Sequence, residues 1–414
     1  MIAAGLLISA ALSHAAAVQT ADAPQSLIAG RVIDAVSRRP IAGVVVTPVG
    51  SAVLPNVSPS VRTPAVLTNA NGQFVLRGLR SGVVFLTAVK GGYVNATYNQ
   101  RRPGGSGQYI PLGDGQRVTD LEIRMWKHGV ISGTIVDEAG DPVVGTGVLA
   151  LGTTFVAGRR RAVTGPFAVT DDRGMYRIAD LTPGDYLIVV PSTQTSVPTD
   201  VMESFFTGVP FTGAQLSDAK RMDLGRELRG IGAAVAPAGS PFGMRAAGQT
   251  ISLPPGTLTP IASTTGMLVY PTVYYPAAPT PAQAATIAVQ SGQERNGVDV
   301  QVQPFRGVRV SGVLIGPDGP SATTGLHLVL AGDDAIEPLE AAAALTDAAG
   351  AFTFPAVPAG EYELRVVRVP RSPPDASEAG RIMTTPSGAV AIASRPSAPT
   401  GPPPIPADAT LVAN

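Results

Sequence analysis

Three stretches of the chain place polar and apolar residues in the same order. Each has a Thr, then an Asn or Asp, then a Gly in one register, and large apolar residues recur at every second position after the glycine. The stretches are 68–76, 170–178 and 346–354. Asn and Asp favour tight turns and Gly accepts a positive φ, so each stretch predicts a β-hairpin. The predicted structural turn residues are Asn69, Gly72, Asp171, Gly174, Asp347 and Gly350.

The strand after each turn has a period of two residues, which predicts one buried face and one exposed face. Its buried positions are Phe74 and Leu76, Tyr176 and Ile178, and Phe352 and Phe354. Short alternating strands separated by turn signals are typical of an antiparallel sandwich. The sequence therefore predicts an all-β chain of tandem Greek-key β-sandwiches.

The repeats also begin alike, because Gly30, Gly133 and Gly312 each lie at a nearly constant distance before the turn glycine. Matching closing segments occur only in the first two repeats, at 109–125 and 286–302. The third repeat is therefore predicted to be an open sandwich with an unpaired sheet edge.

An insertion at 191–269 separates the two halves of the second repeat. Apolar spacing between 215 and 231 predicts one or two short helices, and the remainder is rich in Gly, Pro, Ser and Thr. We expect this insertion to be dispensable for folding. The predicted domains are a signal peptide or apolar leader (1–26), sandwich 1 (27–127), sandwich 2 (128–306), an incomplete sandwich 3 (307–370) and a Pro-rich linker or tail (371–414).

The run Thr-Asp-x-x-Gly-x-Tyr-x-Ile-x-x-Leu-x-x-Gly-x-Tyr, from Thr170 to Tyr186, resembles the carboxypeptidase regulatory-like domain. That domain is a prealbumin-like sandwich related to starch-binding-like folds. The resemblance covers 28–190 and 270–370. It implies an exported bacterial protein in which tandem copies act as spacers, as adhesive or ligand-binding modules, or as appendages of a peptidase or outer-membrane receptor.

The charge balance excludes an electrostatic surface for nucleic acid. Thirty basic residues offset thirty acidic residues, and charged residues make up only 14% of the chain. No cysteine is present, so disulfides and thiolate chemistry are excluded. No apolar run is long enough to span a membrane. The apolar segment 2–12, followed by small residues, favours a secreted, periplasmic or cell-surface protein.

Catalytic signatures are missing from the sequence. The three histidines, His14, His128 and His327, lack the His-x-x-Glu spacing of a zinc carboxypeptidase. Serine-nucleophile and phosphate-binding motifs are also absent. We therefore expect no enzyme activity, no cofactor and no metal, and we expect His327 to be a half-buried strand residue.

Aromatic side chains provide the one specific ligand hypothesis. Flat rings can stack on sugars, and the candidate carbohydrate-binding residues are Trp126, Tyr270, Tyr274 and Tyr275. The competing interpretation is that these rings cover strand edges and domain junctions. The sequence thus predicts a non-catalytic exported protein with a structural, adhesive or ligand-presenting role, whose candidate partners are a polysaccharide or another exported protein. The alternatives are a carbohydrate-binding accessory module and a regulatory fragment associated with a peptidase or receptor.

Overall fold

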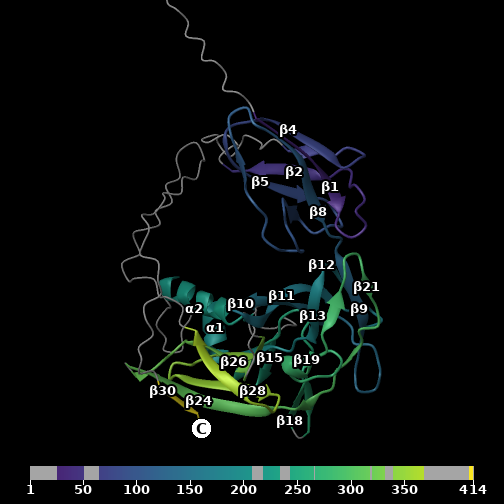
Figure 1. Cartoon of the computed structure of the whole chain (residues 1–414). Coiled ribbons are helices and arrows are strands. Elements are labelled where there is room, and N and C mark those ends of the chain that lie inside the picture. Colours follow the sequence, from purple (N-terminus) through teal and green to yellow (C-terminus); the bar gives the residue numbers. More distant parts are fainter. Residues whose placement is uncertain are drawn as a thin grey trace, which may run out of the picture. The chain divides into compact units, whose positions relative to one another are not determined.

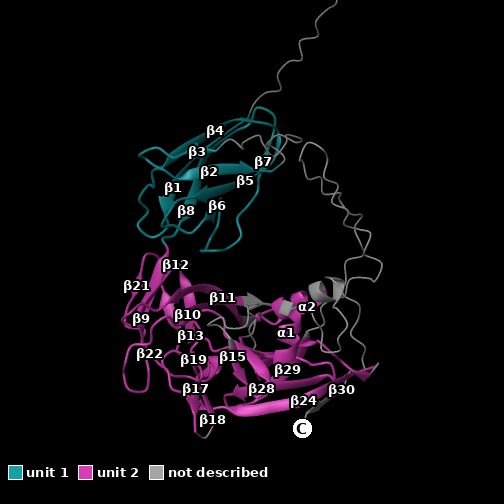
Figure 2. Ribbon diagram, turned by 180° about the vertical axis from the view of Figure 1, so that it is seen from behind, with its two compact units in different colours: residues 1–127 teal, residues 128–414 magenta. Residues whose placement is uncertain are grey.

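The computed structural model describes residues 26–50, 65–207, 218–233, 243–264, 266–317, 319–331, 339–367 and 410–413. These residues are mostly strands, so the predicted all-β fold class is confirmed. The chain forms two compact units, 1–127 and 128–414, which are coloured separately in Figure 2. The predicted leader lies outside the described residues apart from Ser26, and so does the predicted tail apart from 410–413.

The first unit is one β-sandwich (Figure 1). Its strands are β1 (Ser26–Asp34), β2 (Val45–Val49), β3 (Val66–Leu67), β4 (Gln73–Leu79), β5 (Gly82–Val89), β6 (Ala96–Thr97), β7 (Ile110–Leu112) and β8 (Arg117–Met125). One sheet has the order β4-β1-β8, and the other has the order β3-β2-β5-β6, with β7 also paired to β5. The closing strand β8 runs parallel to β1. Buried Ile28, Phe74 and Leu86 belong to the core between the sheets.

The second unit contains the second and third sandwiches. The second sandwich has the strands β9 (Gly129–Val136), β10 (Gly147–Val156), β11 (Arg159–Val169), β12 (Met175–Leu181), β13 (Gly184–Val190), β19 (Val273–Tyr274), β20 (Ile287–Val289), β21 (Glu294–Arg295) and β22 (Val300–Gln301). It repeats the first arrangement, with β12-β9-β21 in one sheet and β11-β10-β13-β19 in the other. The short strands β21 and β22 run parallel to β9.

The third sandwich combines strands of the third repeat with strands of the insertion. The repeat supplies β24 (Val308–Gly316), β25 (Gly319–Pro320), β26 (Gly325–Leu330), β27 (Glu340–Leu345), β28 (Ala351–Val357), β29 (Tyr362–Val367) and β30 (Thr410–Ala413). The insertion supplies β14 (Gln194–Pro198), β15 (Gly243–Ala246) and β16 (Gln249–Ser252). One sheet has the order β25-β24-β28, and the other has the order β15-β16-β14-β27-β26-β29. Three further strands, β17 (Ile261–Ser263), β18 (Gly266–Val269) and β23 (Phe305–Arg306), form a small sheet, and Pro281–Gln283 is a 3-10 turn.

The three predicted turns have the same hydrogen bonds. In each, the Asn or Asp side-chain oxygen accepts bonds from the backbone N–H groups two and four residues later, at 2.8–3.0 Å. The turn glycines Gly72, Gly174 and Gly350 have φ values of +69°, +69° and +75°. Each glycine carbonyl accepts a 2.8 Å bond from the opening strand of its own sandwich. The turn therefore fixes each hairpin directly against that strand.

The threonine before each turn ties the other sheet to the same point. The hydroxyl groups of Thr68, Thr170 and Thr346 each donate to a loop carbonyl at 2.7 Å, and each accepts a bond from the backbone N–H three residues further along that loop. All three threonines are buried. A hydroxyl group both donates and accepts, so no apolar side chain can replace these bonds.

The insertion is part of the core, and our prediction that it is dispensable is wrong. Strand β14 begins four residues after β13 ends and pairs in parallel with β27 of the third sandwich. Strands β16 and β15 extend that sheet further. The segment interpreted as an insertion of the second sandwich thus supplies half of a six-stranded sheet in the third.

Two helices of the insertion cover the outer face of this sheet. These are α1 (Thr199–Thr207) and α2 (Asp218–Gly230), and Figure 1 shows them on the side of β26 opposite to β24 and β28. Leu224 and Leu228 of α2 and Val201 of α1 are buried against Ala343 and Leu345 of β27. The helix predicted between 215 and 231 is therefore present, but it packs on the third sandwich.

The third sandwich is open at one of the two places where the sequence predicted a missing strand. At β24 the closing strand is replaced by β30, which pairs antiparallel. The unpaired edge lies at β29. Strands β7 and β20 pair with the equivalent edges of β5 and β13, and among the described residues no strand pairs with that side of β29.

We predict that Gly174→Ala destabilises the second unit by about 3 kcal/mol. The added Cβ would lie 2.6 Å from the Ile135 carbonyl oxygen, in addition to the strain of a positive φ. Gly140→Ala is the matched control, because Gly140 has φ +86° but no atom within 4 Å of the added Cβ. It should cost only about 1 kcal/mol. Urea unfolding of the full chain measures both variants, and equal losses would contradict the role of close approach.

We predict that Leu228→Ala in α2 destabilises the third sandwich by about 2–5 kcal/mol, because Leu228 is fully buried beneath β27. Hydrogen exchange of the β26 and β27 amides should accelerate accordingly. Arg229→Ala, at the next and exposed position, is the control and should change stability by less than about 0.5 kcal/mol. Unchanged exchange in the Leu228 variant would show that the helices do not support the sheet.

Candidate functional site

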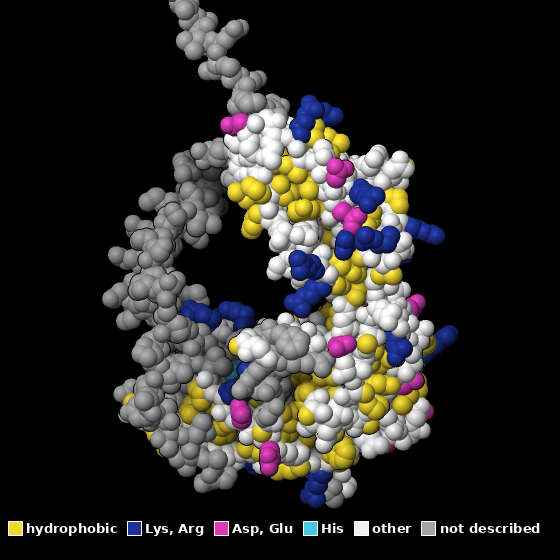
Figure 3. Space-filling model, in the orientation of Figure 1, with side chains coloured by type: hydrophobic (Ala, Val, Ile, Leu, Met, Phe, Trp, Pro, Cys, Tyr) yellow, Lys and Arg dark blue, Asp and Glu magenta, His cyan; other side chains and the backbone are white. Residues whose placement is uncertain are grey.

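The outer face of the first sandwich carries an exposed apolar surface on β2, β3 and β5. We call the docking face the exposed residues of these strands together with the partly buried Phe85 and with Tyr109, which directly precedes β7: Val45, Val49, Leu67, Phe85, Val89 and Tyr109. Figure 3 shows hydrophobic side chains gathered over β2 and β5. Tyr109 is 67% exposed, and its ring centroid lies 5.1 Å from that of Phe85. Contiguous exposed apolar side chains of this kind mark interaction surfaces in soluble proteins.

The equivalent face is covered in the other two sandwiches. In the second sandwich Leu151, Leu187 and Val189 are buried in one cluster with Tyr274 and Ala278. In the third sandwich α1 and α2 cover the corresponding face, as described above. The cover of the second sandwich is partial, because Phe167 and Val169 of β11 stay exposed on this face. In the first sandwich the exposed apolar side chains extend over β2 and β5 as well, whose equivalents in the second sandwich are buried.

A structured loop, residues 97–108, borders the docking face. The buried Gln100 side chain organises this loop: its Oε1 accepts bonds from the backbone N–H and hydroxyl of Thr97, and its Nε2 donates to the Arg102 carbonyl at 2.9 Å. Asn99 donates from Nδ2 to Gln108 Oε1 at 2.6 Å. The Tyr98 N–H donates to the Leu86 carbonyl and so anchors the loop to β5.

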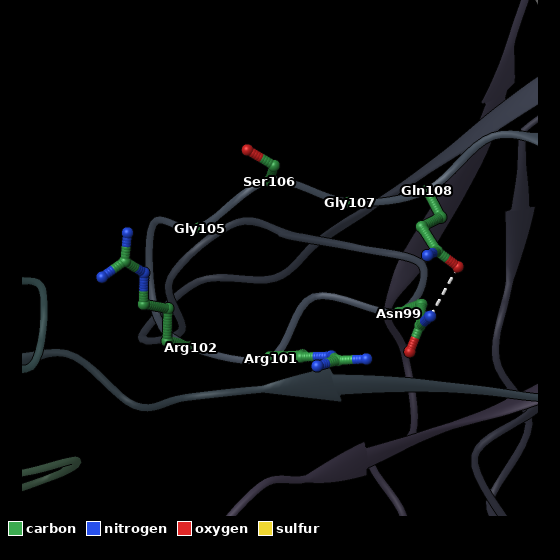
Figure 4. A pocket seen from close by; sticks show the side chains of 7 residues that line it. All are labelled: Asn99, Arg101, Arg102, Gly105, Ser106, Gly107 and Gln108. Atoms are coloured by element: carbon green, nitrogen blue, oxygen red, sulfur yellow. Dashed lines mark hydrogen bonds between the residues drawn. The ribbon is translucent and has the colours of Figure 1, made fainter.

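Two arginines project from this loop around an open surface hollow that Asn99, Ser106 and Gln108 also line. Figure 4 shows the Arg101 and Arg102 side chains extending in different directions from the loop. Both are exposed, and neither forms an ion pair with a described residue. The two guanidinium groups therefore spread positive charge along the rim of the docking face and do not converge on one small anion.

The predicted carbohydrate-binding residues lie elsewhere, and one of them is buried. Tyr274 is 0% exposed, so the prediction that its ring faces a sugar is wrong. Its strand β19 pairs with β13 at the end of the sheet, and the Tyr274 ring is buried on the outer face in one cluster with Leu187 and Val189. Tyr270 lies after β18 and before β19, so Tyr270 and Tyr274 do not share one strand face.

Tyr270 and Tyr275 pack against the core of the second sandwich and are partly buried. Burial, and then the charges of Glu138 and Asp137, raise the pKa of Tyr270. Trp126 is also partly buried, and its carbonyl accepts a bond from Val94. A sugar-binding role for Trp126, Tyr270 and Tyr275 stays a prediction.

The histidines occupy structural positions where they are described. His327 lies in β26 and is 5% exposed, and its Nδ1 lies 2.8 Å from Glu340 Oε1. His128 lies just before β9, and His14 lies outside the described residues. Within the described ranges, no group of three or more His, Asp and Glu side chains is arranged to hold a metal ion. No described helix is long and apolar enough to span a membrane.

A sequence signal for the docking face was available. Residues 83–86 and 88–89 are all apolar, whereas a strand with one wet face normally alternates. Both faces of β5 are therefore apolar, although only one faces the core. The loop arginines carried no such signal, because their arrangement depends on the buried Gln100.

The fold and these surfaces define a tandem β-sandwich protein. No family model matches the chain, and no curated protein matches it. Among solved structures it is similar to a streptococcal ancillary pilin, at 16% identity and a TM-score of 0.26, over 41% of this chain and 54% of the pilin. It is also similar to the minor pilin GBS52 of Streptococcus agalactiae, at 9% identity and a TM-score of 0.26, over 68% of this chain and 96% of that one. A third is the shaft pilin SpaA of Lactobacillus rhamnosus GG, at 10% identity and a TM-score of 0.22, over 68% and 98% of the two chains.

We predict that Gln100→Ala loosens the 97–108 loop, because it removes three hydrogen bonds made by a side chain that is only 4% exposed. Trypsin should then cleave the loop about 10-fold faster, because the loosened loop opens more often. The cleaved bond is the one after Arg101, since Pro103 protects the bond after Arg102. Gln108→Ala is the control, because it removes one exposed hydrogen bond and should have little effect. Equal cleavage rates for the wild type and the Gln100 variant would refute this role.

Proposed function

We propose that the protein is an exported, non-catalytic tandem β-sandwich protein with a structural or adhesive role, in which the docking face binds another exported protein. One observation carries the proposal: apolar side chains on β2 and β5 are exposed in the first sandwich, whereas those of the equivalent strands β10 and β13 are buried in the second and α1 and α2 cover this face in the third. An exposed apolar face costs free energy in water, and a partner that buries it recovers that free energy.

The composition of the docking face fits a protein partner better than a small ligand. Aromatic and arginine side chains are enriched in protein interfaces, and here Phe85 and Tyr109 lie beside a loop that carries Arg101 and Arg102. The surface is a sheet face and the arginines diverge, so charge is distributed over an area. We therefore expect the partner to present apolar side chains bordered by acidic ones.

We also propose that the three sandwiches are copies of the carboxypeptidase regulatory-like module. The support is that the Thr, the Asn or Asp, and the Gly of each turn make equivalent hydrogen bonds in all three. The apolar segment at 2–12 supports export to the periplasm, the cell surface or the medium.

Photo-crosslinking in the cells that make the protein tests the docking face. A photoreactive amino acid replacing Val49, which is 51% exposed, should give a discrete adduct with one exported protein. Tyr109→Asp in the same chain should reduce the yield at least about 10-fold, because a charge would be placed in a desolvated contact. The same amino acid replacing Ile261, an exposed apolar residue of the second unit, is the control and should give no such adduct.

Failure to find an adduct at Val49, or an adduct unaffected by Tyr109→Asp, would contradict protein docking. Retention of the full chain on insoluble polysaccharides distinguishes the carbohydrate alternative. We expect no saturable retention. Saturable retention that is lost in Trp126→Ala or Tyr109→Ala would replace protein docking by sugar binding.

A further inference from the structure

The outer edge of β29 has no paired strand among the described residues, whereas a strand pairs with the equivalent edge in each of the other two sandwiches. In the first sandwich Gly82 and Val84 of β5 pair with Leu112 and Ile110. In the second, Gly184 and Tyr186 of β13 pair with Val289 and Ile287. Gly360 and Tyr362 hold the equivalent positions in the third, and the described residues provide no strand beside them.

One backbone carbonyl in each of β5 and β13 also accepts a hydrogen bond at this edge. The Leu86 carbonyl accepts a bond from the Tyr98 N–H, and the Ile188 carbonyl accepts one from the Tyr275 N–H at 2.8 Å. Both carbonyls lie four residues after the opening glycine of the strand. The equivalent group in the third sandwich is the carbonyl of Leu364, in the middle of β29.

The direction of the β29 backbone groups follows from its pairing with β26. Ala331 donates to the Glu361 carbonyl, so Glu361 faces β26. The N–H and C=O of one residue point to the same side of a strand, and this side alternates along the chain. Tyr362, Leu364 and Val366 therefore direct their backbone groups toward the open edge.

The sequence of β29 is complementary to itself. If two β29 strands pair antiparallel about Leu364, Glu363 of each lies opposite Arg365 of the other, and Tyr362 lies opposite Val366. Glu363 and Arg365 now pair with each other at 2.8 Å, and their side chains are 54% and 44% exposed. Opposite charges across a strand pair stabilise it, and like charges destabilise it.

We propose that β29 pairs with β29 of a second copy of this chain, centred on Leu364, so that two six-stranded sheets join into one continuous sheet. The contact is two-fold symmetric, as in most homodimers. It satisfies the backbone groups of Tyr362, Leu364 and Val366 with those of the partner strand. It lies in the second unit and does not involve the docking face of the first.

Charge exchange in the full chain tests this pairing. Sedimentation velocity should show a dimer for the wild type, and Glu363→Arg and Arg365→Glu should each raise the dimer dissociation constant about 10- to 100-fold, because each places like charges opposite one another twice. The double variant Glu363→Arg/Arg365→Glu should dimerise like the wild type. An equimolar mixture of the two single variants should also form a dimer, because their β29 strands are complementary.

Three results would overturn the proposal. A wild-type monomer with slow hydrogen exchange at Leu364 would mean that the edge is covered within one chain, and a monomer with fast exchange would mean that it stays open. A dimer unchanged by both single variants would place the interface elsewhere. Both charged side chains are exposed, so each variant should melt within a few degrees of the wild type measured at a concentration where it is monomeric. An unchanged melting temperature shows that a variant has lost strand pairing and has not misfolded.

Discussion

The close approach of each turn glycine to the opening strand is the contact on which all three sandwiches depend. At Gly174 there is no room for a Cβ beside the Ile135 carbonyl, and the φ of +69° already favours glycine. The Asp171 side chain fixes the turn, and Thr170 ties the loop of the opposite sheet to it. One short motif thus sets the spacing of the two sheets, which explains why it recurs while the surrounding residues differ.

In each sandwich the sheet that contains β5, β13 or β29 has an outer face that points away from the core. This outer face differs among the three sandwiches. In the second sandwich the part over β10 and β13 is buried in a cluster with Tyr274, and in the third α1 and α2 cover it. In the first, Tyr109 remains exposed against the partly buried Phe85, beside the arginine loop. The difference between the sandwiches lies in these coverings, so function is more readily argued from the uncovered face than from the shared fold.

The sequence was sufficient for features that depend on neighbouring residues. The hairpin turns, the alternating strands and the α2 helix follow from local patterns, and the first compact unit ends at Lys127. The position of β14 could not be predicted, because its sequence Gln-Thr-Ser-Val-Pro does not alternate and its partner β27 lies far along the chain. Tyr274 was misassigned for the same reason: its covering role depends on a distant pairing with β13.

Strand β14 also changes the meaning of a domain in this chain. The chain leaves the second sandwich at the end of β13, and a few residues later β14 enters the sheet of the third sandwich, where it lies between β27 and β16. Without 194–252, β27 would become an edge strand, and Ala343 and Leu345 would lose the helices that bury them. The third repeat therefore lacks the residues to complete its own sheet and core. The second and third sandwiches therefore belong to one compact unit, and the first is a compact unit of its own.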